Sequence, residues 1–524
     1  AVAAVLTTCV AETVYTGLGG GGFATYFEAA TGAVTCLDFF VSVPGTDGDR
    51  TAGPMIAVDV FFGGVPQVYS IGGASVAVPG VPVGCGEVHR RWGRLPWADL
   101  VAPAIRWADE GHPVSSFEYE VNTWCGEFTT YFPSGRHFYL PDGRWVPVGE
   151  RFAYPEMART LEQVAEHGPD WMISGGWAQE FVKVANGMGW DISLEHFEQA
   201  PPPRWQPAHR FDLGEYQVAS LSPPQLQGVF LQVVLGVLRE LDIASVEPMT
   251  AEFLYLVSAA LAVGQAQFGY VNDPTVFDLA LDVFADPDWQ RAQAKLIRSR
   301  LPKRDLSDHA RFSEAGDDGG LMGLVKAGVA SKSSHADQPS GSCELSIVDA
   351  DGNWIQMMNT LQSGGIPGVV IGGIPMVGSH ATLGTHGSAI DSFLGEGIRM
   401  RSTIGNTMVF ADGAPVFQLG TPGNVHCTVP QVLSYWHNHG LDPYEAASMP
   451  RVLPLSANGT VTVEDRVPDA EQEALGRLGL KLRALPYWDY HMGSFQMCYR
   501  DRETGELCAT ADPRRCGVAG GIPA

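Results

Sequence analysis

The chain has 524 residues, of which 45% are hydrophobic and 10% aromatic, so it can bury a sizeable core and is not a disordered chain. Its 58 acidic residues outnumber its 33 basic residues, and the net charge of −25 argues against nucleic acid or a membrane surface as a partner. No apolar run reaches the roughly 20 residues that a membrane span needs, so a small molecule is the expected partner.

The first predicted element is an alanine-rich helix over 1–16, with no Met and no basic flank ahead of it. This start favours a cytoplasmic protein whose upstream segment is missing, with export as the alternative. The nine cysteines form no CxxC pair, which predicts reduced thiols rather than a zinc cage or a disulfide framework.

Glycines follow this helix, and then come two predicted strands over 23–28 and 33–43. Gly17, Gly19 and Gly22 match the dinucleotide pattern GxGxxG. That pattern needs a strand before the glycines and a helix after them, whereas here the order is reversed. Nucleotide binding is therefore not predicted.

Helical periodicity dominates from 92 to 294. The predicted helices cover 95–110, 155–167, 176–188 and 224–241. The polar segment 331–341 is predicted as a solvated loop, and a hairpin with strands over 342–348 and 354–360 follows it around an Asp-Gly turn. Two further strand pairs are predicted, at 407–410 with 416–419 and at 496–500 with 506–511.

Short motifs in a fixed order run through nearly the whole chain: Gly19–Phe23, Asp38-Phe39, Val78–Gly80, His167–Asp170, Ser346–Asn353, Gly420–Gly423, Met492–Ser494 and Asp512–Arg514. With them the chain resembles the γ-glutamyltranspeptidase family, a branch of the N-terminal-nucleophile (Ntn) hydrolases. The resemblance implies an α+β fold, a four-layer αββα sandwich of the Ntn-hydrolase type. It also implies a precursor that cuts itself into 1–341 and 342–524, which remain together as one intertwined domain.

The resemblance places the new N-terminus seven positions ahead of Asp349, at Ser342, where most relatives carry threonine. A serine hydroxyl needs an adjacent base to become a nucleophile. Once the bond between Gly341 and Ser342 is cut, the α-amine of Ser342 is such a base, with an ordinary pKa near 8. Cys343 is the competing nucleophile, but it is one residue out of frame and would point to the other strand face.

Other roles transfer from the family to matching positions. Thr360 would orient the nucleophile, and the backbone amides of Gly423 and Asn424 would form the oxyanion hole. The substrate-binding positions are Gln362, where relatives have asparagine, and the pair Ser402 and Thr403, which would grip a carboxylate. Ordinary strand or loop hydrogen bonding is the alternative for Thr360 and Ser402.

The chain departs from glutathione enzymes at the substrate. Phe40 stands where they carry an arginine for the glutamyl carboxylate, and 372–378 contains no acid for the glutamyl ammonium. Arg401 is either a replacement partner for a substrate carboxylate or a surface charge. Glu344 stands where relatives usually carry histidine, and a solvated strand residue is its alternative interpretation.

Taken together, the resemblance and these departures from it imply an Ntn hydrolase that transfers an acyl group to water through Ser342. Its substrate would be a small carbonyl compound other than glutathione, cleaved at an amide or C–C bond in a bacterial natural-product pathway of the alkylproline type. The alternatives are a γ-glutamyl transferase or hydrolase, an amide acylase, and an uncut, catalytically silent scaffold. No metal or organic cofactor is implied, since His437-Asn438-His439 lacks a third ligand.

Overall fold

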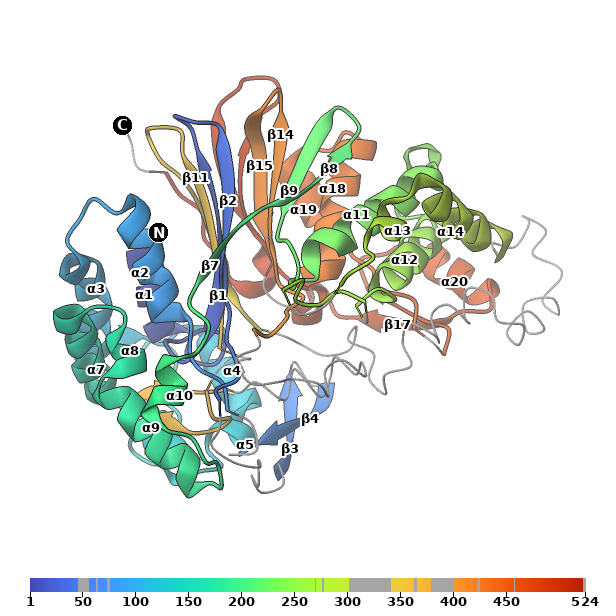
Figure 1. The fold of residues 1–524 in the computed structure, drawn as a ribbon. Helices are drawn as coiled ribbons and strands as arrows, with labels where there is room; N and C mark the ends of the chain where they lie inside the picture. The colour runs from blue at the N-terminus through green and yellow to red at the C-terminus, as the bar shows by residue number, and fades with distance from the viewer. Residues whose placement is uncertain are drawn as a thin grey trace. The chain divides into compact units, whose positions relative to one another are not determined.

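The computed structural model describes residues 1–45, 56–62, 65–72, 76–268, 270–275, 278–300, 341–361, 365–377, 399–421, 425–456 and 458–521. They form two compact units. The first unit holds the described residues within 1–207, 341–377 and 399–400, and the second holds those within 208–300 and 401–521. Each unit combines one large antiparallel sheet with helices (Figure 1), so the predicted mixture of helix and sheet is confirmed.

The large sheet of the first unit has five strands in the order β10-β11-β1-β2-β7. Their bounds are β1 Gly21–Glu28, β2 Ala33–Phe39, β7 Arg204–Pro207, β10 Cys343–Val348 and β11 Trp354–Thr360. The register pairs Gly21 with Thr360 and Cys343 with Asn359. Strand β1 thereby lies between β2, its hairpin partner, and β11, which comes from the far end of this unit's sequence.

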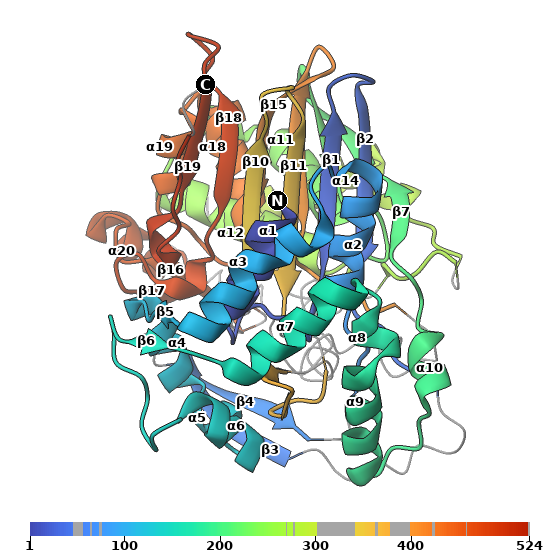
Figure 2. The ribbon, with the colours of Figure 1, turned by 90° about the vertical axis from the view of Figure 1, so that its left-hand side faces the viewer.

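Helices α1 (Val2–Ala11) and α2 (Val81–Trp92) cover one face of this sheet (Figure 2). Asn359 points to this face, where its amide donates to Thr16 Oγ1 just after α1. Phe39 also points there and packs against Gly84 of α2. Successive strand residues alternate between faces, so Ser342, Glu344 and Thr360 point to the opposite face.

The remaining elements of the first unit surround these two layers. The helices are α3 Trp97–Glu110, α4 Ser116–Trp124, α5 Gly126–Thr129, α6 Pro133–Tyr139, α7 Pro155–His167, α8 Trp171–Ser174, α9 Gly176–Gly187 and α10 Leu194–Glu198. Three short strand pairs complete the unit: β3 Ile56–Phe62 with β4 Val65–Ile71, β5 His112–Pro113 with β6 Arg151–Phe152, and β12 Val370–Ile371 with β13 Ile374–Pro375.

The large sheet of the second unit has six strands in the order β19-β18-β15-β14-β9-β8. Their bounds are β8 His209–Leu213, β9 Tyr216–Ser220, β14 Asn406–Ala411, β15 Ala414–Gly420, β18 Gln496–Arg500 and β19 Leu507–Ala511. Helices α11 (Gln227–Glu240) and α18 (Val425–Asn438) pack on this sheet, and α12 (Ala251–Gln265) packs on α11. Both α11 and α12 are apolar nearly all round, as expected of helices inside the core.

The other elements of the second unit lie around this core. They are α13 Asp282–Ala285, α14 Pro287–Arg300, α19 Pro443–Ser448, α20 Asp469–Arg477 and the short helices η1 Ile243–Ser245, η5 Tyr490–Met492 and η6 Pro513–Arg515. Strands β16 (Thr460–Glu464) and β17 (Lys481–Leu485) form a parallel pair, and α20 connects them.

Most predicted elements are confirmed within one to three residues, including α7 and all three strand pairs from 342 onward. The first helix is shorter than predicted: it ends at Ala11, five residues early, and two turns that lead into the glycines follow it. Strand β2 also ends early, at Phe39. Most of the predicted loop 331–341 lies outside the described residues.

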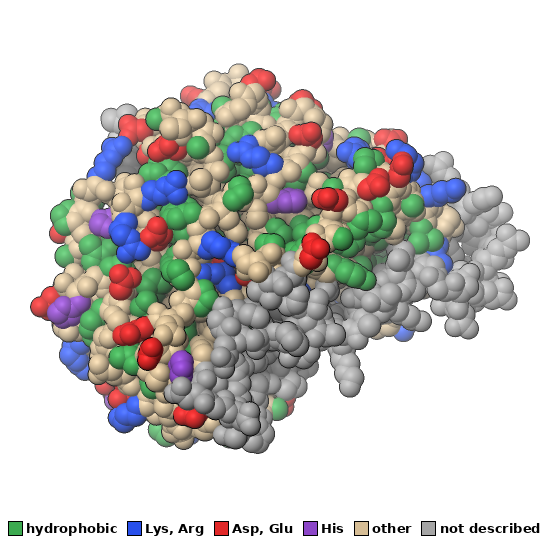
Figure 3. Space-filling model, in the orientation of Figure 1, with side chains coloured by type: hydrophobic (Ala, Val, Ile, Leu, Met, Phe, Trp, Pro, Cys, Tyr) green, Lys and Arg blue, Asp and Glu red, His purple; other side chains and the backbone are tan. Residues whose placement is uncertain are grey.

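On the face drawn in Figure 3, acidic and basic side chains are interspersed among apolar and uncharged ones. The coloured part of this face therefore shows no patch of one charge sign, and such a surface does not concentrate an electric field at one place. Within the described ranges, no helix is both long and apolar enough to cross a membrane.

Candidate active site

The turn between β10 and β11 is built on the carboxylate of Asp349. It accepts hydrogen bonds from the backbone N–H of Asp351 and Asn353 at 3.0 and 2.9 Å, and from the Asn353 side chain at 2.9 Å. Gly352 takes the left-handed conformation that the turn requires, with φ of 81°. The turn sets the register of the hairpin, so Ser342 lies beside Thr360 at the far end of the two strands.

Two hydroxyl groups converge on the peptide carbonyl between Gly341 and Ser342. Ser342 Oγ donates to the carbonyl oxygen of Gly341 at 2.7 Å, and Thr360 Oγ1 donates to the same oxygen at 2.9 Å. Both side chains are buried, with 5% and 3% of their surface exposed. Two donors on one carbonyl polarise it toward nucleophilic attack, so three of the predicted residues meet in a chemically meaningful arrangement.

Cys343 points away from this carbonyl, toward α1. It forms a hydrogen bond with Thr8, and burial, followed by the charge of Glu12, raises the pKa of its thiol well above the usual range. A thiol with a raised pKa holds little thiolate, which is the nucleophilic form. The geometry therefore favours Ser342 over Cys343 as the nucleophile.

Glu344 is buried, with 5% exposed, so its interpretation as a solvated strand residue is wrong. Its Oε1 accepts hydrogen bonds from Ser346 Oγ at 2.7 Å and from Gln356 Nε2 at 3.0 Å. These donors offset part of the cost of removing a carboxylate from water. Glu344 lies two residues from Ser342 and on the same face of the sheet.

The glycine run before β1 allows close backbone packing. A Cβ at Gly20 would overlap the carbonyl of Thr360, so only glycine fits there. The carbonyl of Gly20 also accepts hydrogen bonds from the N–H groups of Gly80 and Val81 at 2.7 and 3.0 Å. The glycine run therefore brings the N-terminus of α2 close to the end of β11. Its role is in backbone packing and not in binding phosphate.

Phe40, at the position of the missing arginine, lies in an apolar contact. Its ring stacks on that of Phe23 at 5.1 Å between centroids, and 2% of Phe40 is exposed. Arg399 reaches the backbone of this residue and donates to the Phe40 carbonyl at 2.9 Å. The same guanidinium pairs with buried Asp38 at 3.4 Å and donates to the Pro201 carbonyl at 3.2 Å. Arg399 thus holds the end of β2 in place.

In the second unit, the backbone around the predicted carboxylate-binding pair Ser402 and Thr403 is fixed. The N–H of Ser402 donates to Gln225 Oε1 at 2.8 Å, and its carbonyl accepts from the N–H of Leu226 at 3.0 Å. Ser402 Oγ accepts from the N–H of Ile404 at 3.1 Å. A role for this pair in binding a carboxylate stays a prediction.

Arg401 is buried, with 5% exposed, so its interpretation as a surface charge is wrong. Its Nη1 donates to the carbonyls of Phe268 and Val271, in the segment after α12. These contacts fix the backbone next to Ser402. A role for Arg401 in holding a substrate carboxylate stays a prediction, as do those of Gln362, Gly423 and Asn424, which lie outside the described residues.

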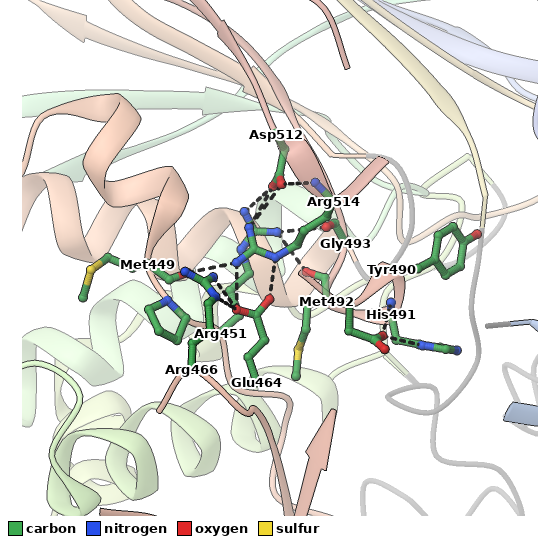
Figure 4. Close-up of polar contacts among 12 residues, drawn as sticks. Met449, Arg451, Glu464, Arg466, Tyr490, His491, Met492, Gly493, Asp512 and Arg514 are labelled. Atoms are coloured by element: carbon green, nitrogen blue, oxygen red, sulfur yellow. Dashed lines mark hydrogen bonds and ion pairs between the residues drawn. The ribbon is translucent and has the colours of Figure 1, made fainter. Parts of the chain in front are cut away.

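Five charged side chains of the second unit form the arginine cluster (Figure 4), in which all but the partly exposed Arg466 are buried: Arg451, Glu464, Arg466, Asp512 and Arg514. Glu464 accepts from Arg514 Nε and from Arg466 Nη2, each at 2.5 Å. Asp512 pairs with Arg451 and also accepts from Arg514 Nη1 at 3.1 Å. Burial, followed by the neighbouring Arg514, lowers the pKa of Arg451 to about 10, so Arg451 remains charged at neutral pH.

The arginine cluster connects two of the motifs that suggested the family. Arg451 Nη1 donates to the carbonyls of Met492 and Gly493 at 3.0 and 2.9 Å, while its Nη2 binds Asp512. Thr428 Oγ1 of α18 donates to the same Met492 carbonyl at 3.1 Å. Since α18 begins directly after Asn424, the cluster holds the helix that follows the predicted oxyanion residues.

Sequence reasoning overlooked Arg399, Arg451 and Glu464 as partners in these networks. At least one charged partner of each lies far along the chain: 361 residues separate Asp38 from Arg399, 61 separate Arg451 from Asp512, and 50 separate Glu464 from Arg514. Separations of this size leave no pattern that a reading of the local sequence could have found.

Cysteine and histidine side chains named in the sequence analysis lie in the described part of the chain. No group of three His, Cys, Asp or Glu residues there is placed to hold a metal ion, and all nine cysteines are free thiols. His437 packs against the rings of Tyr216 and Trp436, and burial lowers its pKa. His437 is thus a packed side chain.

Comparison with known proteins gives a consistent result. The sequence profile described as Gamma-glutamyltranspeptidase matches residues 1–522. The chain is 24% identical to "Glutathione hydrolase proenzyme" of Bacillus subtilis (strain 168) over 98% of this chain and 85% of the relative. It is 25% identical to "Acylase ACY 1 proenzyme" of Pseudomonas sp. (strain SE83) over 100% of this chain and 89% of the relative.

The fold is also similar to that of a solved structure. The crystal structure of cephalosporin acylase from Bacillus halodurans superimposes with a TM-score of 0.77 at 21% sequence identity, over 98% of this chain and 89% of that chain. This similarity confirms the predicted α+β sandwich fold.

Proposed function

Because the chain belongs to the γ-glutamyltranspeptidase family of Ntn hydrolases, we propose that it cuts itself between Gly341 and Ser342 and then transfers acyl groups through Ser342. One observation carries this proposal: the hydroxyls of Ser342 and Thr360 both donate to the carbonyl oxygen of the bond to be cut. The names of the similar proenzymes support processing in the same sense.

Self-cleavage starts when Ser342 Oγ attacks the carbonyl carbon of Gly341. The C–O bond of an ester forms, the C–N bond breaks, and the proton of Oγ passes to the departing nitrogen of Ser342. Water then cleaves the ester, which leaves a carboxylate on Gly341 and a free α-amine on Ser342. Thr360 Oγ1, already bonded to the carbonyl oxygen at 2.9 Å, stabilises the negative charge that develops there.

Turnover repeats this chemistry on a substrate. The α-amine of Ser342 takes the proton from Oγ as Oγ attacks, and returns it to the leaving group. The backbone amides of Gly423 and Asn424 are the proposed oxyanion donors, with Gln362, Ser402 and Thr403 on the substrate. Arg401 supports Ser402 through its bonds to the 268–271 segment. Water finally releases the acyl group.

The proposed fragments 1–341 and 342–524 would stay together after the cut. In the first unit, β1, β2 and β7 come before the cut and β10 and β11 after it. In the second unit, β8 and β9 come before it and the other four strands after it. Separation would break strand pairing in both sheets, so we propose that the mature enzyme is a heterodimer whose fragments form one intertwined domain.

We propose a small carbonyl substrate other than glutathione, with cleavage of an amide or C–C bond in a natural-product pathway of the alkylproline type. The apolar stack of Phe40 on Phe23 supports this, because a charged glutamyl group would lose its partner there. The alternative is a γ-glutamyl or amide substrate, which the names of similar hydrolases and acylases keep open.

Intact mass and N-terminal sequencing of the denatured protein test the proposed cut. Cleavage predicts fragments of about 37 and 20 kDa, the smaller beginning Ser-Cys-Glu-Leu. A fragment that begins at Cys343 would assign the nucleophile to the cysteine. A single chain that stays uncut for days would contradict the proposal and favour the silent scaffold.

Hydrolysis of γ-glutamyl-p-nitroanilide tests the substrate proposal. We expect at least about 100-fold slower release of nitroaniline than from an apolar acyl anilide of similar length, because the charged anchors are missing. Faster release from the γ-glutamyl compound would show that the chain is a γ-glutamyl enzyme. The cut itself would be unaffected by that result.

A further inference from the structure

We propose that Tyr15 is a positioning residue for self-cleavage, a role that rests on the proposed function. Its ring would hold Gly341 so that the carbonyl to be attacked stays between the hydroxyls of Ser342 and Thr360. A Cβ built at Gly341 would overlap the ring carbons Cδ1 and Cε1 of Tyr15. The ring therefore packs directly against the Cα of Gly341, and a side chain at this position is not accommodated.

Tyr15 is itself held firmly in place. Its carbonyl accepts a hydrogen bond from the N–H of Leu361 at 2.9 Å, which is the residue directly after Thr360. Its ring lies 5.6 Å from that of Phe117, at an angle of 31°, and 3% of Tyr15 is exposed. One residue thus contacts Gly341 through its ring and the end of β11 through its backbone.

This double contact matters because self-cleavage is an orientation-limited reaction. Ser342 Oγ and the Gly341 carbonyl belong to adjacent residues, so the bond between them forms only when the intervening peptide is turned correctly. A displacement of about 1 Å at a reacting centre can cost about 100-fold in rate. Without the ring, the Cα of Gly341 could move into the vacated space and carry its carbonyl away from both hydroxyls.

A double-mutant cycle tests this role directly. The variants are Gly341→Ala, Tyr15→Ala and the combination of both, and the readout is the rate at which the fragments of about 37 and 20 kDa form after synthesis. We expect Gly341→Ala to slow the cut at least about 100-fold and Tyr15→Ala to slow it about 10- to 100-fold. In the double variant, the space left by the ring admits the new methyl group. The cut should then be at least about tenfold faster than in Gly341→Ala alone.

Two further variants separate positioning from folding. Tyr15→Phe keeps the ring and should retain cleavage within about twofold of the wild type. Tyr154→Ala removes an equally buried tyrosine of the same unit, also 3% exposed, which stacks on Phe138. It should lower the melting temperature as Tyr15→Ala does, yet cut at the wild-type rate.

The outcomes separate this role from the proposed function. A double variant as slow as Gly341→Ala would overturn the role of Tyr15 while a cut wild type still upheld self-cleavage. Equal slowing by Tyr154→Ala and Tyr15→Ala would also overturn it, because a general loss of stability would then explain both. A wild-type chain that is never cut would overturn the proposed function and this role together.

Discussion

The start of β10 and the arginine cluster both bury polar groups, but they do so in opposite ways. At Gly341, two uncharged hydroxyls donate to one carbonyl oxygen. In the arginine cluster, three guanidinium groups bind two carboxylates. The guanidinium groups donate their remaining hydrogen bonds to backbone carbonyls such as that of Met492. The first arrangement polarises a single bond, whereas the second matches charge with charge.

This difference teaches what each region contributes. Removal of a neutral hydroxyl from a buried site costs little stability, so its main effect is on the reaction rate. A buried ion loses far more when its partner is removed, because an uncompensated charge then remains out of water. We therefore expect variants at Ser342 and Thr360 to change rates, and variants in the arginine cluster to change stability.

Ser342→Ala should have the largest effect. The chain should remain a single uncut polypeptide, and its hydrolase activity should fall at least about 1,000-fold, because both the nucleophile and the α-amine base are lost. Gel electrophoresis and an acyl-anilide assay measure the two effects. Ser346→Ala is the matched control, since Ser346 lies four residues further along on the same face and donates to Glu344 instead. Normal cutting of Ser342→Ala at the same bond would refute the assignment.

Glu464→Gln should produce the largest loss of stability. It leaves Arg466 and Arg514 without their shared carboxylate, which is fully buried. We expect the free energy of unfolding to fall by about 3–5 kcal/mol. Urea unfolding in the uncut Ser342→Ala background measures this change on one continuous chain.

Glu180→Gln is the matched control for Glu464→Gln. Glu180 pairs with Lys183 at 3.0 Å, but the two side chains are 48% and 75% exposed. Exposed ion pairs contribute less than about 1 kcal/mol, so this variant should barely change the urea midpoint. Equal losses in the two variants would contradict the distinction between the two kinds of ion pair.

Local sequence was enough to predict those parts of the fold that local chemistry decides. The Asp-Gly turn and its flanking strands identified the β10–β11 hairpin, and apolar periodicity identified α7 with its bounds. The parallel pair β16 and β17 was missed, because its strands pair across a helix and carry no hairpin turn between them. Strands β7 to β9 were missed because each is only four or five residues long and they lie within a helical stretch.

In the candidate site too, the sequence predicted the contacts that local structure sets and missed those that depend on distant residues. The residues beside the cut, Gly341, Ser342 and Thr360, are joined by one hairpin, so their meeting follows from the predicted register. Buried Arg401 binds carbonyls more than 100 residues away, and buried Glu344 accepts a hydrogen bond from Gln356 of the neighbouring strand. The residues next to Arg401 and Glu344 in the sequence do not indicate that these side chains are buried. Both side chains were therefore equally compatible with a solvated surface.

Thr360→Val tests the second hydroxyl at the carbonyl. The variant keeps the size and β-branching of threonine but removes the donor, and the cut should slow by about 100- to 1,000-fold. Its stability should change by about 1 kcal/mol, which is the usual scale for one hydrogen bond. A time course of fragment formation measures the rate. Thr360→Ser retains the hydroxyl and should cut readily, and comparable slowing of both variants would contradict the role of the hydroxyl.

Cys343→Ala should have the smallest effect, although Cys343 directly follows the proposed nucleophile. Its thiol faces α1 and its raised pKa keeps it protonated at neutral pH, so the cut should proceed within about twofold of the wild-type rate. Labelling with iodoacetamide at pH 8 measures the same property chemically: exposed Cys516 should react well before Cys343. As the pH rises, labelling of Cys343 should begin only above the range in which an ordinary thiol reacts. If Cys343→Ala blocked the cut and Cys343 were labelled first, the nucleophile would be the cysteine.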